Sequence, residues 1–258
     1  MTFGLGNHRG VYNSAWVGSV IAALCIVQLA LVSFYLVKNS IERDCTTGVG
    51  QIIATTPLSK LQYTFGKMLS NLIFLMTMVI IIMLAAIVMQ VVRGEVVQIQ
   101  LWTFVAPFLF LVLPVMALVA ALAVLFETIP RLSGGLGNIV YFFLWVFLLA
   151  SIVSTAERGS KDAQQQAINE PLGLTVLTSN VVNAFKVEHP DYAGIPRGAT
   201  VLKAPVRAFV WNGVKWSVGI VLRRLFWVGV APSVLLTITT PPNPGVPLTR
   251  LRSALASR

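Results

Sequence analysis

The chain has 258 residues, of which 56% are hydrophobic and 11% are charged, and its mean hydropathy is +0.81. A soluble domain carries about 25% charged residues, so this composition excludes an ordinary soluble protein and predicts an integral membrane protein. The formal net charge of +10 would favour nucleic acid in a soluble protein, but here it indicates anchoring to anionic lipid headgroups, and we expect no nucleic-acid partner.

Five apolar runs are long enough to cross a bilayer as helices. About 20 apolar residues span the roughly 30 Å hydrocarbon core, and a helix satisfies its own backbone polar groups there. The sequence therefore predicts an all-α, polytopic integral membrane protein with about five transmembrane helices in a single transmembrane domain, residues 1–258. The predicted spans are residues 15–37, 69–91, 102–126, 136–153 and 222–239.

A polar interruption, residues 38–68, separates the first two predicted spans. It leaves the membrane with Glu42, Arg43 and Asp44 in succession. About thirty residues is much more than two membrane helices need for a turn. We therefore expect a partner to dock on this segment.

The second half of the interruption carries a helix-start signal. Thr56 followed by Pro57 is typical of an N-cap and a first helical residue, where the missing proline donor costs nothing. This pattern predicts an amphipathic helix over residues 58–67 that leads into the second span. The interruption is then a short helix, a turn and a stiff connection, which would carry an applied force into the bilayer.

Basic residues in short segments predict the orientation of the chain. If residues 38–68 are cytoplasmic, the opposite short segments hold only Arg9 and Arg93. The positive-inside rule then predicts an outside N-terminus and a cytoplasmic C-terminus. The basic residues on the cytoplasmic side would be Lys38, Arg43, Lys60, Lys67, Arg131, Arg250, Arg252 and Arg258.

Residues 154–221 form, in this orientation, a long extracytoplasmic loop. Its basic residues carry little weight for topology because long loops are weak signals. From Phe209 onward the mixed aromatic and basic composition predicts an interfacial segment leading into the last span, with membrane anchoring favoured over substrate contact. The residues concerned are Trp211, Lys215, Trp216, Arg223, Arg224 and Trp227.

The predicted spans lack the residues that membrane-embedded chemistry needs. No Asp, Glu, Lys, Arg or His lies in the middle of a span; Gln28 and Gln90 are the main long polar groups there, and Glu127 lies at a helix end. An ionisable residue inside a span costs about 2.5 to 3.5 kcal/mol and persists where function requires it. The sequence therefore argues against a membrane-embedded enzyme or a proton-coupled carrier, and we assign no catalytic residue.

No nucleotide or metal site is predicted. The phosphate-binding pattern G-x-x-x-x-G-K-[ST] does not occur, and the nearest glycine-rich stretch, residues 133–138, lacks the lysine and is better interpreted as a tight turn. His8 and His189 stand alone in the sequence, with no other ligand type at metal spacing, so we interpret them as two surface histidines. We expect no metal and no other cofactor.

The polar interruption carries a series of short motifs. Residues 42–67 contain an acidic residue, a Thr-Gly pair, a hydrophobic stretch, a Thr-Pro-Leu-Ser core and a Gly-Lys pair, in this order. This run resembles the cytoplasmic coupling segment of ABC-2 type permeases, the membrane subunits of many ABC exporters. Residues 106–110, 125–130, 134–141, 209–214 and 224–227 look similar to the later parts of that family, so the resemblance covers most of the chain.

The resemblance implies a permease, not an enzyme, that moves an unknown substrate across a bacterial plasma (inner) membrane. It would work as a homodimer or heterodimer with a separate cytoplasmic ATPase subunit. Two departures stand out: Gln51 replaces a common glutamate, and the similarity starts at the second span of the family, which implies an N-terminally shortened member. The implied coupling residues are Glu42, Arg43, Asp44, Thr47, Gly48, Gln51, Thr55, Pro57, Leu58, Ser59 and Lys67.

Two other classes of function stay open at this point. One is a membrane scaffold or channel subunit without ATP coupling, and the other is a membrane-embedded enzyme. The length of residues 38–68 favours the permease over the scaffold, and the uncharged spans favour it over the enzyme.

Overall fold

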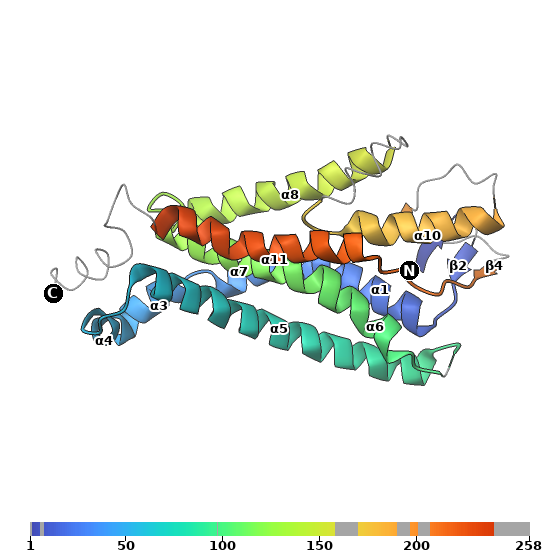
Figure 1. Ribbon diagram of the computed structural model, residues 1–258, viewed down its shortest axis with the longest axis horizontal. Helices are drawn as coiled ribbons and strands as arrows, with labels where there is room; N and C mark the ends of the chain where they lie inside the picture. Colours follow the sequence, from blue (N-terminus) through green and yellow to red (C-terminus); the bar gives the residue numbers. More distant parts are fainter. Residues whose placement is uncertain are drawn as a thin grey trace. The chain divides into compact units, whose positions relative to one another are not determined.

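A computed structural model describes residues 2–5, 8–96, 98–157, 170–189, 197–200 and 207–239 (Figure 1). Helices make up most of the described chain. They are α1 (Ser14–Leu24), α2 (Ala30–Val37), α3 (Ser40–Thr46), α4 (Val49–Ala54), α5 (Lys60–Arg93), α6 (Leu101–Pro107), α7 (Leu113–Thr128), α8 (Gly135–Glu157), α10 (Leu174–Glu188) and α11 (Val218–Thr239), with π-helical segments η1 (Cys25–Leu29) and η2 (Phe108–Val112). The strands are β1 (Thr2–Leu5), β2 (His8–Gly10), β3 (Arg197–Thr200) and β4 (Arg207–Phe209).

Within the described part of the chain, four helical runs are long and apolar enough to cross a membrane. They match the first four predicted spans, so the prediction of an all-α polytopic membrane protein is confirmed. The α11 helix contains the fifth predicted range, and its crossing of the membrane stays a prediction. The four runs are Ser14–Thr46, Lys60–Arg93, Leu101–Thr128 and Gly135–Ile152.

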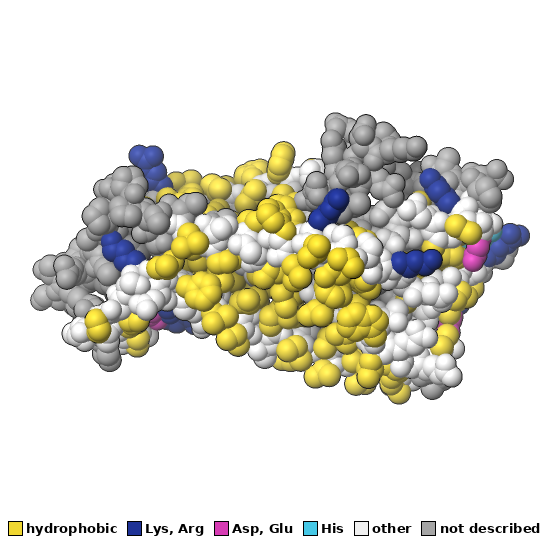
Figure 2. Space-filling view, in the orientation of Figure 1, with side chains coloured by type: hydrophobic (Ala, Val, Ile, Leu, Met, Phe, Trp, Pro, Cys, Tyr) yellow, Lys and Arg dark blue, Asp and Glu magenta, His cyan; other side chains and the backbone are white. Residues whose placement is uncertain are grey.

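Large apolar side chains lie on the surface of several of these helices. Ile81 of α5, Phe147 of α8 and Phe226 of α11 are each more than 60% exposed. Figure 2 shows how densely hydrophobic side chains cover the helical part of the visible face. Lipid tails are as apolar as these side chains, so a bilayer is the solvent in which such a surface is stable.

The chain divides into two compact units, which are described here one at a time. Unit 1 comprises Met1–Gln28, Met78–Pro114 and Leu148–Leu225, and unit 2 comprises Leu29–Thr77, Val115–Phe147 and Phe226–Arg258. The α5 helix contributes its first half to unit 2 and its second half to unit 1.

Unit 1 contains a small sheet in the strand order β3-β1-β2-β4. The β1 strand pairs antiparallel with β2 and β3, and β2 pairs parallel with β4. The sequence analysis did not predict this sheet, because strands of three or four residues are too short to show a period-two pattern. Its pairing also joins the start of the chain to residues near position 200.

The α1 and α6 helices of unit 1 pack at close range. A Cβ atom at Gly18 would lie 2.8 Å from the carbonyl oxygen of Phe104, so a larger residue would push the helices apart. The Asn13 side chain accepts a hydrogen bond from the Trp16 nitrogen at 2.8 Å and donates one to the Trp211 carbonyl oxygen at 2.8 Å. Trp16 and Trp211 are buried and meet edge to face, with ring centroids 6.2 Å apart.

Arg224 is the largest fully buried side chain in the described part of unit 1. Its Nη1 atom donates a hydrogen bond to the Glu170 carbonyl oxygen at 2.7 Å. The Glu170 carboxylate accepts one from the Thr175 nitrogen at 2.8 Å, at the start of α10. Burial raises the pKa of the Glu170 carboxyl, and the hydrogen bonds from Thr175 oppose this. Trp211 and Arg224, two members of the predicted interfacial segment, are buried among other residues of the protein, and the interfacial position of the segment stays a prediction.

The two histidines lie together in unit 1, although they are far apart in the sequence. The ring centroids of His8 and His189 are 4.7 Å apart, and both rings contact Phe185. Both histidines are half-buried, and β2 brings His8 next to the end of α10, a contact that the sequence did not predict. The described residues contain no group of three or more His, Cys, Asp or Glu side chains able to hold a metal ion.

Aromatic stacking joins α2, α7 and α8 in unit 2. The rings of Phe34 and Tyr141 are parallel, with centroids 3.7 Å apart, and Phe126 meets Phe34 edge to face at 5.3 Å. The Tyr141 hydroxyl donates a hydrogen bond to the Ala30 carbonyl oxygen at 2.8 Å. This hydrogen bond stabilises the fold, because a buried donor without an acceptor lowers the free energy of unfolding. The cluster thus fixes α2 immediately before the polar interruption begins.

Candidate functional site

The polar interruption folds into two short helices, α3 and α4. Asn39 takes a left-handed φ of 72°, which turns the chain between the end of α2 and the start of α3. Gly48, with φ of 77°, makes the turn between α3 and α4; glycine adopts this conformation without steric cost. The predicted arrangement of a short helix, a turn and a helical connection to the second span is confirmed.

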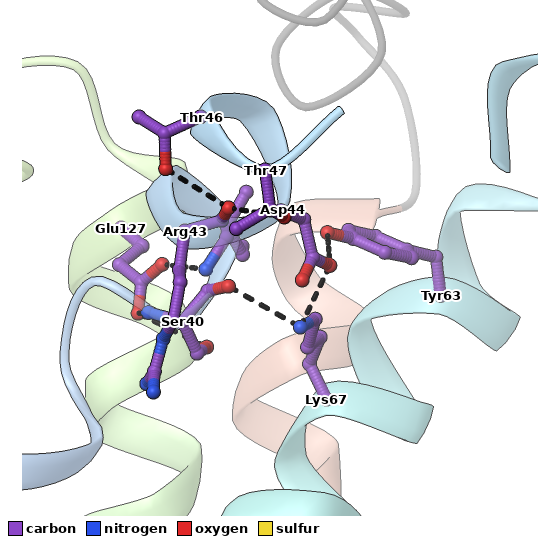
Figure 3. A network of polar contacts seen from close by, with 9 residues as sticks. Ser40, Arg43, Asp44, Thr46, Thr47, Tyr63, Lys67 and Glu127 are labelled. Carbon is purple, nitrogen blue, oxygen red and sulfur yellow. Dashed lines mark hydrogen bonds and ion pairs between the residues drawn. The ribbon is translucent and has the colours of Figure 1, made fainter. Parts of the chain in front are cut away.

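The first turn of α3 is held by Glu127, at the end of α7 (Figure 3). One carboxylate oxygen accepts hydrogen bonds from the Ser40 nitrogen at 2.9 Å and the Ser40 hydroxyl at 3.3 Å, and the other accepts one from the Ile41 nitrogen at 2.6 Å. A helix begins with backbone N–H groups that lack intrahelical partners, and a negative charge there also interacts favourably with the helix dipole. The Glu127 carboxylate therefore caps α3 from another segment of the chain.

The opposite side of α3 is fastened to the start of α5. The Lys67 ammonium lies 2.7 Å from a carboxylate oxygen of Asp44 and donates to the Ser40 carbonyl oxygen at 3.2 Å. The Tyr63 hydroxyl donates to the same Asp44 oxygen at 2.9 Å. These groups point toward one another in Figure 3. The Asp44 and Lys67 side chains are only 15% and 21% exposed, so this pair is shielded more than a surface ion pair.

Lys38 makes a third fixed point, just before α3. Its side chain donates to the Gly134 carbonyl oxygen at 2.8 Å and to the Asn138 side-chain oxygen at 2.7 Å, and the residue is 6% exposed. The Tyr35 hydroxyl donates to the Asn138 carbonyl oxygen at 3.2 Å. The end of α2 is thereby attached to the first turns of α8.

The start of α5 lies two residues later than predicted, at Lys60 instead of residue 58. The Thr56 nitrogen and hydroxyl both donate to the Ile53 carbonyl oxygen, so Thr56 ends α4 and does not cap α5. The cap is Ser59: its hydroxyl accepts from the Gln62 nitrogen at 3.2 Å, while the Gln62 side-chain oxygen accepts from the Ser59 nitrogen at 3.0 Å. This reciprocal pair is a capping box, and it places the helix start after Pro57.

Exposed side chains remain on α3, on α4, in the linker that follows α4 and on early α5, outside these contacts. The charged ones are Glu42 and Arg43, both exposed. Apolar side chains lie among the polar ones: Val49 is 43% exposed, Leu58 is 45% exposed and Phe65 is 44% exposed. We call this set of five residues the docking surface. Its mixture of charged and apolar groups is typical of a protein interface and has no arrangement that indicates catalysis.

The structure thus sorts the predicted coupling residues into three groups. Asp44 and Lys67 form an internal ion pair, and Gly48 makes a turn. The Gln51 side chain lies outside the described residues. The exposed members are Glu42, Arg43, Thr47, Thr55, Pro57, Leu58 and Ser59, of which Ser59 also caps α5.

The sequence analysis missed Ser40, Tyr63 and Glu127 as members of this site. The available signal was Glu127, an acid that directly follows an apolar run and therefore needs a partner near the membrane boundary. Nothing in the local sequence names that partner, because Ser40 and Glu127 are 87 positions apart.

Comparisons with known protein families, with curated proteins and with solved structures find no match to this chain.

Proposed function

We propose that this chain is the membrane-spanning permease subunit of an ABC-2 type exporter, driven by ATP hydrolysis on a separate ATPase subunit. The ATPase would bind the docking surface on α3, α4 and early α5. The chain itself would perform no chemistry and would need no cofactor. Its substrate is left open, since an uncharged path accepts many cargo classes.

One observation carries the proposal: α3 is attached to two membrane helices at once. Glu127 fixes its N-terminus to α7, and the Asp44–Lys67 pair fixes its other side to α5. A seven-residue helix is too short to be stable alone, so its position depends on these contacts. A displacement of α3 by a bound ATPase would therefore be transmitted to α5 and α7 together.

The docking surface is suited to a second protein. Exposed apolar residues beside charged ones resemble the core and rim of an interface, and the charged groups would set orientation and association rate. A loop that merely connected two spans would need neither the two short helices nor the hydrogen bonds that join α3 to α7. Asp44 and Lys67 would then support the coupling segment from inside, through their ion pair, without touching the partner.

The proposal includes a place and an assembly. The docking surface would face the cytoplasm of a bacterial cell, with the N-terminus outside and the C-terminus inside, as the short-loop charges predict. Two permeases, identical or different, would enclose the substrate path between them, with membrane lipids around the exposed apolar helices. The basic residues near the spans would contact anionic headgroups.

Site-specific photo-crosslinking tests the proposal in native membranes. A photoreactive residue at Leu58 should form an adduct with an ATP-binding subunit, in a yield that differs between ATP and ADP. The matched control is the same residue at Val187, which is 83% exposed and lies on α10. Two results would contradict the proposed coupling: an adduct yield at Val187 equal to that at Leu58, or a yield at Leu58 that is the same with ATP and with ADP.

A further inference from the structure

The two histidines of the chain lie in ring contact within unit 1. His8 is the first residue of β2, and His189 follows the last residue of α10. The chain contains two histidines in all, so both of its imidazoles are at this place. Their ring centroids are 4.7 Å apart and the ring planes are tilted by 44°, so the rings do not stack face to face. The sequence alone predicted no metal site here, because most of the chain separates the two residues.

The backbone holds each histidine within its own element. His8 pairs with Leu5 of β1 and with Arg207 of β4. The His189 nitrogen donates a hydrogen bond to the Phe185 carbonyl oxygen at 2.9 Å, at the end of α10. The contact between the two rings therefore joins the sheet to α10.

An apolar wall lies beside the two imidazoles. The Phe185 ring meets His8 edge to face at 5.1 Å and lies 4.6 Å from His189, measured between centroids. Phe209 packs edge to face on Phe185 at 5.2 Å, and both phenylalanines are 2% exposed. The histidines themselves are half-buried. The pair thus has an apolar shell on one side, which limits access of solvent, and an open side that water reaches.

The ring separation suits two imidazoles that share one metal ion. A ring nitrogen binds Zn²⁺ at about 2.0 to 2.1 Å, which puts the ring centroid about 3.2 Å from the ion. Two imidazoles on one ion then have centroids about 4.5 Å apart at a right angle and about 5.2 Å apart at a tetrahedral angle. The observed 4.7 Å lies between these values. The fold therefore holds the rings at the spacing that a shared ion requires.

We propose that His8 and His189 together bind one divalent transition-metal ion of the Zn²⁺, Ni²⁺ or Cu²⁺ class, and that this ion fastens β2 to the end of α10. Imidazole is a ligand that suits all three metals, and histidine is the commonest metal ligand in proteins. Two protein ligands leave the other coordination positions to water, so the ion is exchangeable. The inference concerns unit 1 alone and does not depend on the proposed function.

An ion at this place strengthens a part of the fold that has few other contacts of its own. The strands have only three or four residues each, and strands this short supply few hydrogen bonds. An ion that binds the folded chain and not the unfolded chain stabilises the folded state by mass action. Its effect should appear in the two elements that it joins.

The charged side chains around the pair are exposed or already paired. Those on the elements that carry the histidines or pair with them are Arg9 of β2, Arg207 of β4, and Lys186 and Glu188 of α10. Arg9 is bound to Glu95. Arg207, the register partner of His8, opposes a cation, but water screens an exposed charge. Arg207→Gln should therefore tighten metal binding by no more than a few-fold.

Copper titration tests the site, because every imidazole signal of the chain comes from this pair. The full chain, carrying Cys25→Ala and Cys45→Ser and a purification tag without histidine, is freed of metal and titrated with Cu²⁺ at pH 7.5. Electron paramagnetic resonance should show one ion per chain, bound by two imidazole nitrogens. His8→Gln and His189→Gln should each weaken binding at least tenfold, since one imidazole remains. The matched control, Val187→Ala, changes an 83% exposed neighbour and should bind as wild type does.

Hydrogen exchange tests the link between the two elements. Saturating Zn²⁺ should slow amide exchange several-fold at residues 8–10 and 185–189 of the wild-type chain. It should leave both segments unchanged in the double variant His8→Gln, His189→Gln, whose exchange without metal shows whether the variant is folded. Metal binding should also weaken as the pH falls from 7.5 to 5.5, because protons compete for the imidazole nitrogens.

Three results would overturn the proposal. Copper binding by the double variant as tight as by wild type would mean an adventitious ion only. If each single variant kept a site of unchanged affinity, the two histidines would not bind one ion together. If Zn²⁺ bound without slowing exchange in either segment, the ion would not fasten β2 to α10. None of these results bears on cross-linking at Leu58, so this proposal and the proposed function fail independently.

Discussion

The backbone nitrogen of Ile41 lies 2.6 Å from a carboxylate oxygen of Glu127, so the end of α7 is bonded to the first turn of α3. The two residues are 86 positions apart and belong to the same compact unit. A cap normally comes from the residue next to the helix, and Asn39, which occupies that place, makes no side-chain capping bond. The position of α3 is consequently set by a membrane helix and not by its own sequence.

The first prediction concerns Glu127→Ala, which leaves the Ser40 and Ile41 N–H groups without a partner. Losing a cap costs about 1 kcal/mol and losing hydrogen bonds to a charged group about 1.5 to 3 kcal/mol, so local opening of α3 should become at least tenfold more frequent. Hydrogen exchange of the amides in residues 40–47 measures this change. Glu188→Ala on α10 is the control, since Glu188 is exposed. Unchanged exchange in Glu127→Ala would show that the cap contributes nothing.

The second prediction concerns the Asp44–Lys67 pair and is made with a double-mutant cycle. Asp44→Asn and Lys67→Met should each lower the free energy of unfolding, because each loosens α3 against α5. The double variant should lose less of this free energy than the sum of the two single losses. We expect a coupling of about 1 kcal/mol, above the usual surface value because both side chains are largely shielded. Thermal unfolding in detergent supplies the four values. Strict additivity would mean that the pair is not an energetic unit.

Much of the membrane fold followed from the sequence, because one physical requirement dominates it. Apolar runs of about 20 residues have to become helices in lipid, and the first four did. The helix start at residue 58 failed for a local reason. Thr56-Pro57 and Ser59-Lys-Leu-Gln62 are both patterns typical of a helix start. The helix begins at the second pattern, because the Ser59 and Gln62 side chains each accept a hydrogen bond from the backbone nitrogen of the other residue.

The rest of the site depended on contacts that no local pattern encodes. The sequence analysis gave Asp44 and Lys67 only as coupling residues, and only the packing of α3 against α5 shows that they pair. His8 and His189 looked isolated, because the sheet that brings them together joins distant segments. Sequence reasoning located the polar interruption but not the contacts that fix its helices in place.

The third prediction is a pH dependence at the Arg9–Glu95 pair in unit 1. The hydrogen bond from Arg9, with a further one from the Tyr12 nitrogen at 3.3 Å, lowers the pKa of Glu95 below its usual range. A lowered acid pKa stabilises the fold above the unfolded value of about 4.3, and this stabilisation is lost as the pH falls through the folded pKa.

Glu95→Gln should therefore be less stable than wild type at pH 7, and the two should converge near pH 3. Both side chains are about one-third exposed, so we expect only about 0.5 kcal/mol after screening. Thermal unfolding of both proteins in detergent from pH 3 to pH 7 measures the difference. A difference that grows toward low pH would contradict the assigned sign.

The fourth prediction concerns the orientation of the chain and follows from the short-loop charges. Single cysteines at Leu58 and Val187, in a background with Cys45→Ser, are treated with a membrane-impermeant maleimide in intact cells. Val187→Cys should be labelled, whereas Leu58→Cys should react only after the membrane is permeabilised. Both positions are exposed, so access to the side chain does not bias the comparison. The reverse pattern would place the docking surface outside and remove the coupling function.

The last prediction separates binding to the ATPase from the internal support of α3. Glu42 is exposed and has no ion pair among the described residues, whereas Asp44 is paired with Lys67. Glu42→Lys should therefore weaken binding of the ATPase about tenfold, roughly 1.4 kcal/mol, and should speed hydrogen exchange in α3 less than Asp44→Lys does, because Glu42 affects α3 only through the charge in its first turn. Asp44→Lys should weaken binding of the ATPase and also speed hydrogen exchange in α3, because it breaks the ion pair that attaches α3 to Lys67 of α5.

Co-purification of the ATPase at matched expression gives the affinity ranking, and Glu188→Lys, an equal reversal on exposed α10, is the control. A charge at the interface affects mainly binding of the ATPase, whereas a charge that holds α3 in place also affects hydrogen exchange in α3. The two measurements together therefore show which role each residue has. If Glu42→Lys retains the ATPase as fully as Glu188→Lys does, the exposed charges of α3 do not contact a partner. The docking surface would then be only the outer side of a connector.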